Sequence, residues 1–260
     1  MERVTSWIAR LVFVFLYLPI AALIVYSFNS SEVSYRFDGL SFRWYAELFR
    51  DQMLLESLRT SAIVGVIAAL LATVIGFLTA FGLVRFRVKG RGFFLGAILI
   101  PLIVPEIVLG VALLTVFSTV GVPTGLFTLV LGHVVITLPL ATLVLMGAMS
   151  SLDPSLSEAA TDLGASPWMT FRRVLFPLLR PSILAAFMLS FTTSFSNIVI
   201  STFTSGVGTT TLPLRIYSSL KTGLTPELNA LGTILVVLTL GVILIVGVSQ
   251  MRRILAGPRP

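Results

Sequence analysis

The sequence predicts an all-α integral membrane protein with six membrane-spanning helices. Hydrophobic residues make up 56% of the chain, charged residues 11%, and the mean hydropathy is +1.02. A soluble domain carries roughly 25% charged residues. Six apolar runs approach the ~20 residues that a helix needs to cross a bilayer. We interpret residues 1–260 as one transmembrane domain. The predicted spans are residues 8–28, 61–84, 93–120, 125–149, 182–203 and 228–250.

The first span is interpreted as retained rather than as a cleaved signal. Arg3 and Arg10 precede an apolar run from Leu11 to Phe28, an arrangement that also occurs in secretory signals. However, the run is longer than the apolar core of a typical signal, and it lacks a convincing small-residue cleavage site. It therefore counts as the first of the six spans.

The positions of the basic residues predict the orientation in the membrane. The connection between the second and third spans, RFRVKGR, holds Arg85, Arg87, Lys89 and Arg91 and no acid. Such a loop is typical of the cytoplasmic side. Six spans then place both termini in the cytoplasm, with 12 of the 18 Lys and Arg residues on that side. The net charge of +7 therefore reflects membrane orientation rather than a nucleic-acid surface.

Two outer segments are predicted to be structured. Residues 29–60 combine mixed charges with clustered aromatic residues, which favours a short amphipathic helix on the outer membrane interface. Residues 205–211 form a flexible loop, and a short helix with the sequence LPLRIYSSLK follows at residues 212–221.

A charged segment at residues 153–177, on the cytoplasmic side, predicts two short helices separated by a glycine turn. The first helix has two competing starts: Asp153-Pro154, or a capping box formed by Ser155 and Glu158. Its apolar residues follow helical spacing, so that one face is apolar. These residues are Leu156, Ala159, Ala160 and Leu163.

Gly164 is expected to end the first helix in the left-handed conformation. Ser166-Pro167 would start the second, and Pro177 would end it. An apolar face turned away from the bilayer favours docking to another protein. The alternative is a cytoplasmic linker that packs on its own membrane domain.

The amino-acid sequence of this segment resembles the EAA loop of ATP-binding-cassette importer permeases. In that loop Glu-Ala-Ala is followed by Gly and later by a hydrophobic-Pro pair, which here would be Phe176-Pro177. The resemblance implies a coupling helix that fits a groove on a separate ATPase and transmits its closure to the spans. The coupling residues implied are Glu158, Ala159, Ala160, Asp162, Gly164 and Pro177.

Other stretches resemble the second permease subunit of spermidine/putrescine-type systems. They are YLPI at 17–20, SFNSS at 27–31, FRWY at 42–45, LPLRIYS at 212–218 and TPELNALGT at 225–233. The resemblance implies the type I importer permease fold in a bacterial inner membrane. It also implies four kinds of neighbour: a second permease in a heterodimer, two ATPase subunits, an extracytoplasmic solute-binding protein and lipid. Polyamines are the solutes implied, and other small solutes such as amino-acid derivatives, opines or phosphonates are the alternative.

The sequence lacks the common motifs for nucleotide binding, metal binding and catalysis. It contains no G-x-x-x-x-G-K-[ST] nucleotide loop, no H-E-x-x-H, no cysteine and a single histidine, His133. We therefore expect a transporter subunit without catalytic residues, metal site or cofactor, with ATP and Mg²⁺ on the partner ATPase. A secondary carrier or channel is the alternative class, although the chain shows no repeated half. A membrane-embedded enzyme would need more converging polar groups.

Glu106 is a candidate residue of the translocation pathway, because it is the only acid predicted inside a span. A carboxylate at membrane depth usually faces a cavity or a partner. It follows Pro101 and Pro105, which free backbone carbonyls. The alternative is that Glu106 lies near the outer interface or caps a break in the helix.

The fifth span is unusually polar, and its candidate pathway residues are Thr192, Phe195, Ser196 and Asn197. Such residues either line a path or tie helices together. His133 is expected to hydrogen-bond to a neighbouring helix. The polyamine-type pattern carries acids at the position of Ser196-Asn197. Their replacement by neutral residues leaves open a neutral, zwitterionic or anionic solute recognised by hydrogen bonds.

Overall fold

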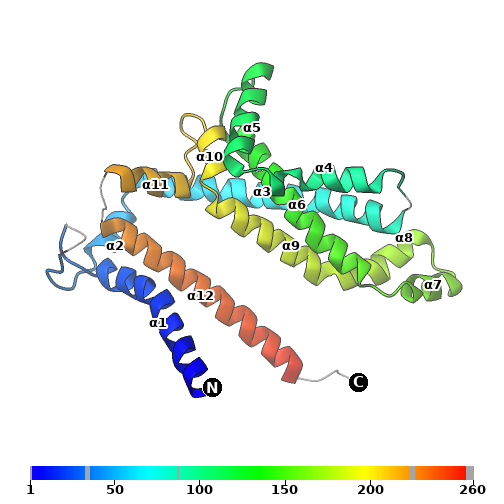
Figure 1. Cartoon of the computed structure of the whole chain (residues 1–260), viewed down its shortest axis with the longest axis horizontal. Helices are drawn as coiled ribbons and strands as arrows, with labels where there is room; N and C mark the ends of the chain where they lie inside the picture. The colour runs from blue at the N-terminus through cyan, green and yellow to red at the C-terminus, as the bar shows by residue number, and fades with distance from the viewer. Residues whose placement is uncertain (1, 33–35, 87, 223–225, 256–260) are drawn as a thin grey trace. The chain divides into compact units, whose positions relative to one another are not determined.

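The computed structural model describes residues 2–32, 36–86, 88–222 and 226–255. Side chains at 2–4, 222, 242–243 and 245–255 lie outside the description. Within the described residues the chain forms helices and one isolated β-bridge, between Asn29 and Leu40 (Figure 1). The all-α prediction is therefore confirmed. The chain divides into two compact units, residues 1–55 with 216–260 and residues 56–215, and each is described by itself.

The first unit contains α1 (Glu2–Ser27), α2 (Arg43–Leu48) and α12 (Pro226–Leu255). Two helices cross the boundary between the units, α3 (Gln52–Arg85) and α11 (Leu212–Thr222). The second unit contains α4 (Arg91–Ile103), α5 (Glu106–Val120), α6 (Leu126–Ser150), α7 (Ser155–Asp162), α8 (Pro167–Thr170), the π-helical turn η1 (Phe171–Leu175), α9 (Phe176–Ser196) and α10 (Val199–Thr204).

The described helices support a multi-pass membrane protein, but they do not confirm the count of six spans. Four are long and apolar enough to cross a bilayer: residues 5–27, 52–85, 126–150 and 167–196. The pair α4 and α5 would make a fifth if it counts as one bent span. Within α12, the apolar stretch whose side chains the structure describes is Pro226–Gly241. It is shorter than the 18 residues required of a membrane span.

The single helix predicted over residues 93–120 is in fact broken. Helix α4 ends at Ile103, α5 begins at Glu106, and the two are bent by 108°. Pro105 explains the break, because its ring disfavours the helical conformation for the residue before it. Val104 accordingly has an extended ψ of 132°.

The helix predicted over residues 182–203 is also interrupted. Helix α9 ends at Ser196, and Asn197 is extended with a ψ of 120° before α10 begins at Val199. The side chain of Asn197 accepts a hydrogen bond from Ile200 N at 2.8 Å. Asn residues favour such local bonds over continuing a helix, so this one caps the short helix that follows.

The second unit is held together by close packing between α3, α6 and α9. Figure 1 shows α6 and α9 running side by side. Small residues make the approach of α3 possible: a methyl group on Gly76 would lie 3.0 Å from Thr142 N and 3.1 Å from Ala141 Cβ. Without a hydrophobic driving force between helices in lipid, such close packing is a main source of stability. The buried core of this region is formed by Ala72, Ala80, Ala141, Leu145, Met149, Leu179 and Ala186.

The first unit is organised around Asn29. Its side-chain oxygen accepts from Ser31 N at 3.2 Å and Asp38 N at 3.0 Å, and its backbone oxygen accepts from Trp44 Nε1 at 2.6 Å. Helix α2, six residues long, buries Trp44 and Leu48. The short amphipathic helix predicted in this segment is therefore present: Trp44 and Leu48 form its buried face, while the flanking Phe42 and Phe49 are exposed. Its place on the outer membrane interface stays a prediction.

Candidate functional site

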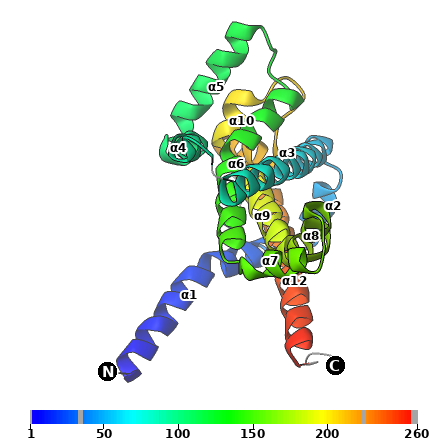
Figure 2. The same ribbon diagram turned by 90° about the vertical axis from the view of Figure 1, so that its right-hand side faces the viewer.

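The predicted coupling segment forms helix, glycine turn and helix in the second unit (Figure 2). Its first helix starts at Asp153-Pro154, because Asp153 Oδ1 accepts a hydrogen bond from Ser155 N at 2.9 Å. The structure thus favours this start over the capping box of Ser155 and Glu158. The same bond holds the pKa of the exposed Asp153 carboxyl below its ordinary value, so the group is ionised at neutral pH.

Gly164 ends α7 as predicted. Its φ of +78° lies in the left-handed region, and the N–H of Ala165 returns to Ala160 O at 2.9 Å. Ser166 then caps α8 by accepting from Met169 N at 3.3 Å. The left-handed backbone at Gly164 and the side-chain cap at Ser166 therefore define the turn between the two short helices.

Most of the apolar face of α7 points away from the protein. Ala160 is buried, but Leu163 is 88% exposed, and Leu156 is also exposed. Trp168, just beyond the turn, is 67% exposed. Glu158, Ala159 and Asp162 are exposed as well. A linker that packed on its own domain would bury these large side chains, so the exposure favours the docking interpretation.

Pro177 does not end the second helix, contrary to the prediction. Helix α8 runs through the π-helical turn η1 into α9, and Pro177 lies in the first turn of α9. A proline is tolerated within this continuous helix because the π-helical turn before it changes the hydrogen-bond register, which accommodates the missing N–H and the ring. The coupling segment thus continues into a candidate membrane span, residues 167–196, without a loop.

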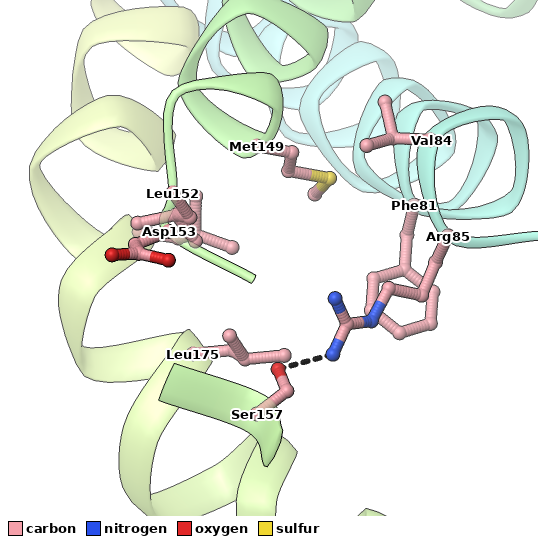
Figure 3. Close-up of a pocket in the computed structure, with 9 residues that line it drawn as sticks. Phe81, Val84, Arg85, Met149, Leu152, Asp153, Ser157 and Leu175 are labelled. Atoms are coloured by element: carbon pink, nitrogen blue, oxygen red, sulfur yellow. Dashed lines mark hydrogen bonds between the residues drawn. The ribbon is translucent and has the colours of Figure 1, made fainter. Parts of the chain in front are cut away.

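A small cavity of about 40 Å³ lies behind the coupling segment (Figure 3). It is lined by Phe81, Val84, Arg85, Met149, Leu152, Asp153, Ser157, Leu175 and Leu179. Arg85 Nη2, at the end of α3, donates to Ser157 Oγ on α7. In the sequence, Arg85 indicates only the orientation of its loop, and no local pattern predicts this contact, because the two residues are 72 positions apart.

The structure brings most of the candidate pathway residues together. Glu106, Thr192, Ser196 and Asn197 line one open groove of about 450 Å³, and Thr193, Ile198 and Val199 complete its wall. Glu106 is the first residue of α5 and is exposed, so it stands at the break between α4 and α5 as well as in the groove. Phe195 is not among the lining residues, and its half-buried ring packs on Phe191 with 5.6 Å between centroids.

Glu106 is held by Asn197. Asn197 Nδ2 donates to Glu106 Oε2 at 3.1 Å. The remaining groove surface carries the hydroxyls of Thr192, Thr193 and Ser196. One carboxylate among several hydroxyls and an amide can bind an ammonium group or a polyol, and the carboxylate favours the cation.

His133 ties helices together, as expected. The buried ring shares hydrogen bonds with Ser194 Oγ at 2.7 Å and with Ser201 Oγ at 3.1 Å, on α9 and α10. Both ring nitrogens are occupied by protein, which leaves none for a ligand.

Comparisons with known proteins agree with these features. Residues 72–256 match the family described as binding-protein-dependent transport system inner membrane component. The chain is 40% identical over 234 residues to the spermidine/putrescine transport system permease protein PotC of Haemophilus influenzae, covering 90% of this chain and 91% of that protein. It is 38% identical over 242 residues to the putrescine transport system permease protein PotI of Escherichia coli K12, covering 90% and 85%.

A solved structure shares the fold. A chain in the crystal structure of a bacterial ABC transporter involved in the import of the acidic polysaccharide alginate matches with a TM-score of 0.70. The match covers 96% of this chain and 95% of that chain at 17% sequence identity. The fold is therefore that of an ABC importer permease, a transporter subunit rather than an enzyme, and the chain belongs to the family of binding-protein-dependent transport system inner membrane components.

Proposed function

We propose that this chain forms half of the translocation pathway of an ATP-driven polyamine importer. The observation that carries the proposal is the exposed carboxylate of Glu106 in a groove whose other polar side chains carry hydroxyl and amide groups. The names of the relatives, which are polyamine permeases, support the same solute class.

The electrostatics of the groove suit a weakly held cation. An ammonium about 4 Å from the Glu106 carboxylate gains about 4 kcal/mol at an effective dielectric of about 20, before desolvation. Ser196 and Asn197 add hydrogen-bonding groups without charge. A passage site needs such moderate binding, because a solute that binds too tightly does not leave.

Glu106→Gln tests the cation role. Gln keeps an oxygen that can accept from Asn197 Nδ2, so the local structure should persist while the charge is lost. We expect putrescine and spermidine uptake to fall about tenfold or more in vesicles that contain the whole importer. Glu56→Gln is the matched control, because Glu56 is an exposed acid that does not line the groove. Unchanged polyamine uptake in Glu106→Gln would reject the cation role, and no polyamine uptake by the unaltered importer would reject the solute assignment in favour of another small solute.

The assembly we propose contains this chain and a similar second permease, two ATPase subunits and a solute-binding protein. ATP and Mg²⁺ would bind to the ATPase subunits. The support is the exposed apolar face at Leu156, Leu163 and Trp168, which offers a docking surface beside the acids Glu158 and Asp162. Co-purification of the subunits tests this composition, and a complex with two copies of this chain and no other permease would contradict it.

A further inference from the structure

The coupling segment contacts a helix to which it is not connected in sequence. Residues 153–175 join α6 to α9 directly, whereas α3 ends at Arg85, far away along the chain. Even so, Arg85 reaches α7 and donates to Ser157 Oγ, and Figure 3 shows its guanidinium pointing across the mouth of the cavity toward that hydroxyl.

A second contact reinforces the first. Phe171, in the π-helical turn, packs its ring against Phe81 at 5.6 Å and Phe77 at 6.1 Å between centroids, both on α3. Trp168 also stacks on Phe171, with 5.6 Å between the ring centroids. The cytoplasmic end of α3 is thus held by a polar contact to α7 and an aromatic contact to η1, one on each side of the glycine turn.

Helix α3 leads from this joint to the polar part of the fifth span. Arg85 and Gly65 are 20 residues apart in one unbroken helix, a distance of about 30 Å along its axis. A methyl group on Gly65 would lie 3.0 Å from the ring of Phe191, so α3 and α9 are in close contact there. Phe191 in turn packs on Phe195, next to the groove residue Ser196.

We infer that Arg85 is a positioning residue that carries movement of the coupling segment into α3 through Ser157. The inference rests on the proposed docking of α7 to the ATPase. The guanidinium suits this task because it is charged and planar and donates in fixed directions. When α7 tilts, the contact therefore moves α3 with it, and the two helices do not slide past each other. Its place in the last turn of α3 adds a favourable interaction with the helix dipole, which keeps the cation at that end.

A double-mutant cycle tests the inference in the whole importer. Arg85→Ala and Ser157→Ala should each lower the solute transported per ATP hydrolysed about threefold to tenfold, the range for a typical hydrogen bond, because this contact lies at an exposed site. Because both remove the same contact, the double variant should be no worse than either single variant. Arg85→Lys should restore part of the loss, since it keeps the charge but not the fork of donors. Arg91→Ala is the matched control, a cation near the end of the same loop that does not line the cavity.

The outcomes separate this inference from the docking proposal. If Glu158→Ala uncouples transport while Arg85→Ala and Ser157→Ala do not, the joint with α3 is rejected and docking stands. If the Arg85 and Ser157 losses are fully additive, they do not act through their contact, and the inference is again rejected. If Glu158→Ala and all these variants keep the normal transport per ATP, both ideas fail.

Discussion

Asn197 joins two helix breaks by donating a hydrogen bond to Glu106, which lies 91 residues earlier in the chain. The same side chain caps α10 by accepting from Ile200 N at 2.8 Å. One amide therefore holds the start of α5 and the start of α10 together. The Glu106 carboxylate is oriented by Asn197, whose own side chain is fixed by its bond with Ile200 N. This hydrogen bond orients the carboxylate without an ion pair.

We predict that Asn197→Ala lowers both stability and uptake. Loss of an Asn cap costs about 1 kcal/mol, and Glu106 loses its donor. Uptake should fall for every transported solute, charged or neutral, because the change affects geometry. Thermal unfolding and uptake measured on one preparation check this. Thr202→Ala is the control, since Thr202 Oγ1 donates to Ile198 O one turn earlier in the chain and Thr202 does not line the groove. Normal unfolding of Asn197→Ala would show that the cap is dispensable.

A second prediction concerns the turn at Gly164. Nothing lies within 4 Å of a methyl group placed there, so any effect of a substitution comes from the φ of +78°. Gly164→Val should strain the backbone by ~1–2 kcal/mol and tilt α7. Gly164→Asn should be nearly silent, because Asn adopts this conformation more readily. ATPase stimulation by solute-loaded binding protein is the measurement. Equal stimulation in the Val variant and the unaltered protein would contradict a coupling role for this turn.

Glycines of α6 provide a third prediction. A methyl group on Gly132 would lie 2.8 Å from Ile200 Cγ2 and 3.0 Å from Thr204 Cγ2, whereas one on Gly147 would meet nothing within 4 Å. Gly132→Ala should therefore destabilise the protein by about 1–3 kcal/mol through overpacking. Gly147→Ala should be neutral or slightly stabilising, because Ala is the better helix former. The midpoint of thermal unfolding in detergent distinguishes the pair, and equal midpoints would contradict the close contact between α6 and α10 at Gly132.

His133 supports a fourth prediction. His133→Leu removes bonds to Ser194 and Ser201 that link α6 to α9 and α10. Hydrogen bonds between membrane helices contribute about 0.6 kcal/mol on average and up to about 1.7. We expect a lower unfolding midpoint with unchanged solute preference. His133→Gln should recover part of the loss, since Gln can both donate and accept. A changed preference among polyamines would instead place His133 in the pathway.

The sequence predicted local features well because their causes are local. The glycine turn at Gly164 and the cap at Ser166 depend on residues within a few positions, so they could be located by type and spacing. The break before Glu106 had a visible cause in Pro105, yet length and hydropathy favoured one continuous span. The break at Asn197 had only a weak local signal, the tendency of Asn to bond nearby backbone, and length and hydropathy again favoured one continuous span. The contact of Arg85 with Ser157 could not be predicted from a local pattern, because the two residues are 72 positions apart.

The last prediction is the orientation, which rests on the basic loop between α3 and α4. The chain has no cysteine, so single cysteines can be introduced without a background. Exposed positions are Ser155, at the start of α7, and Thr210, in the loop before α11. We expect Ser155→Cys to react with a membrane-impermeant maleimide only after the membrane is opened, and Thr210→Cys to react in intact cells. The reverse pattern would invert the topology, and it would place the exposed face of α7 on the side without ATP, where no ATPase could dock.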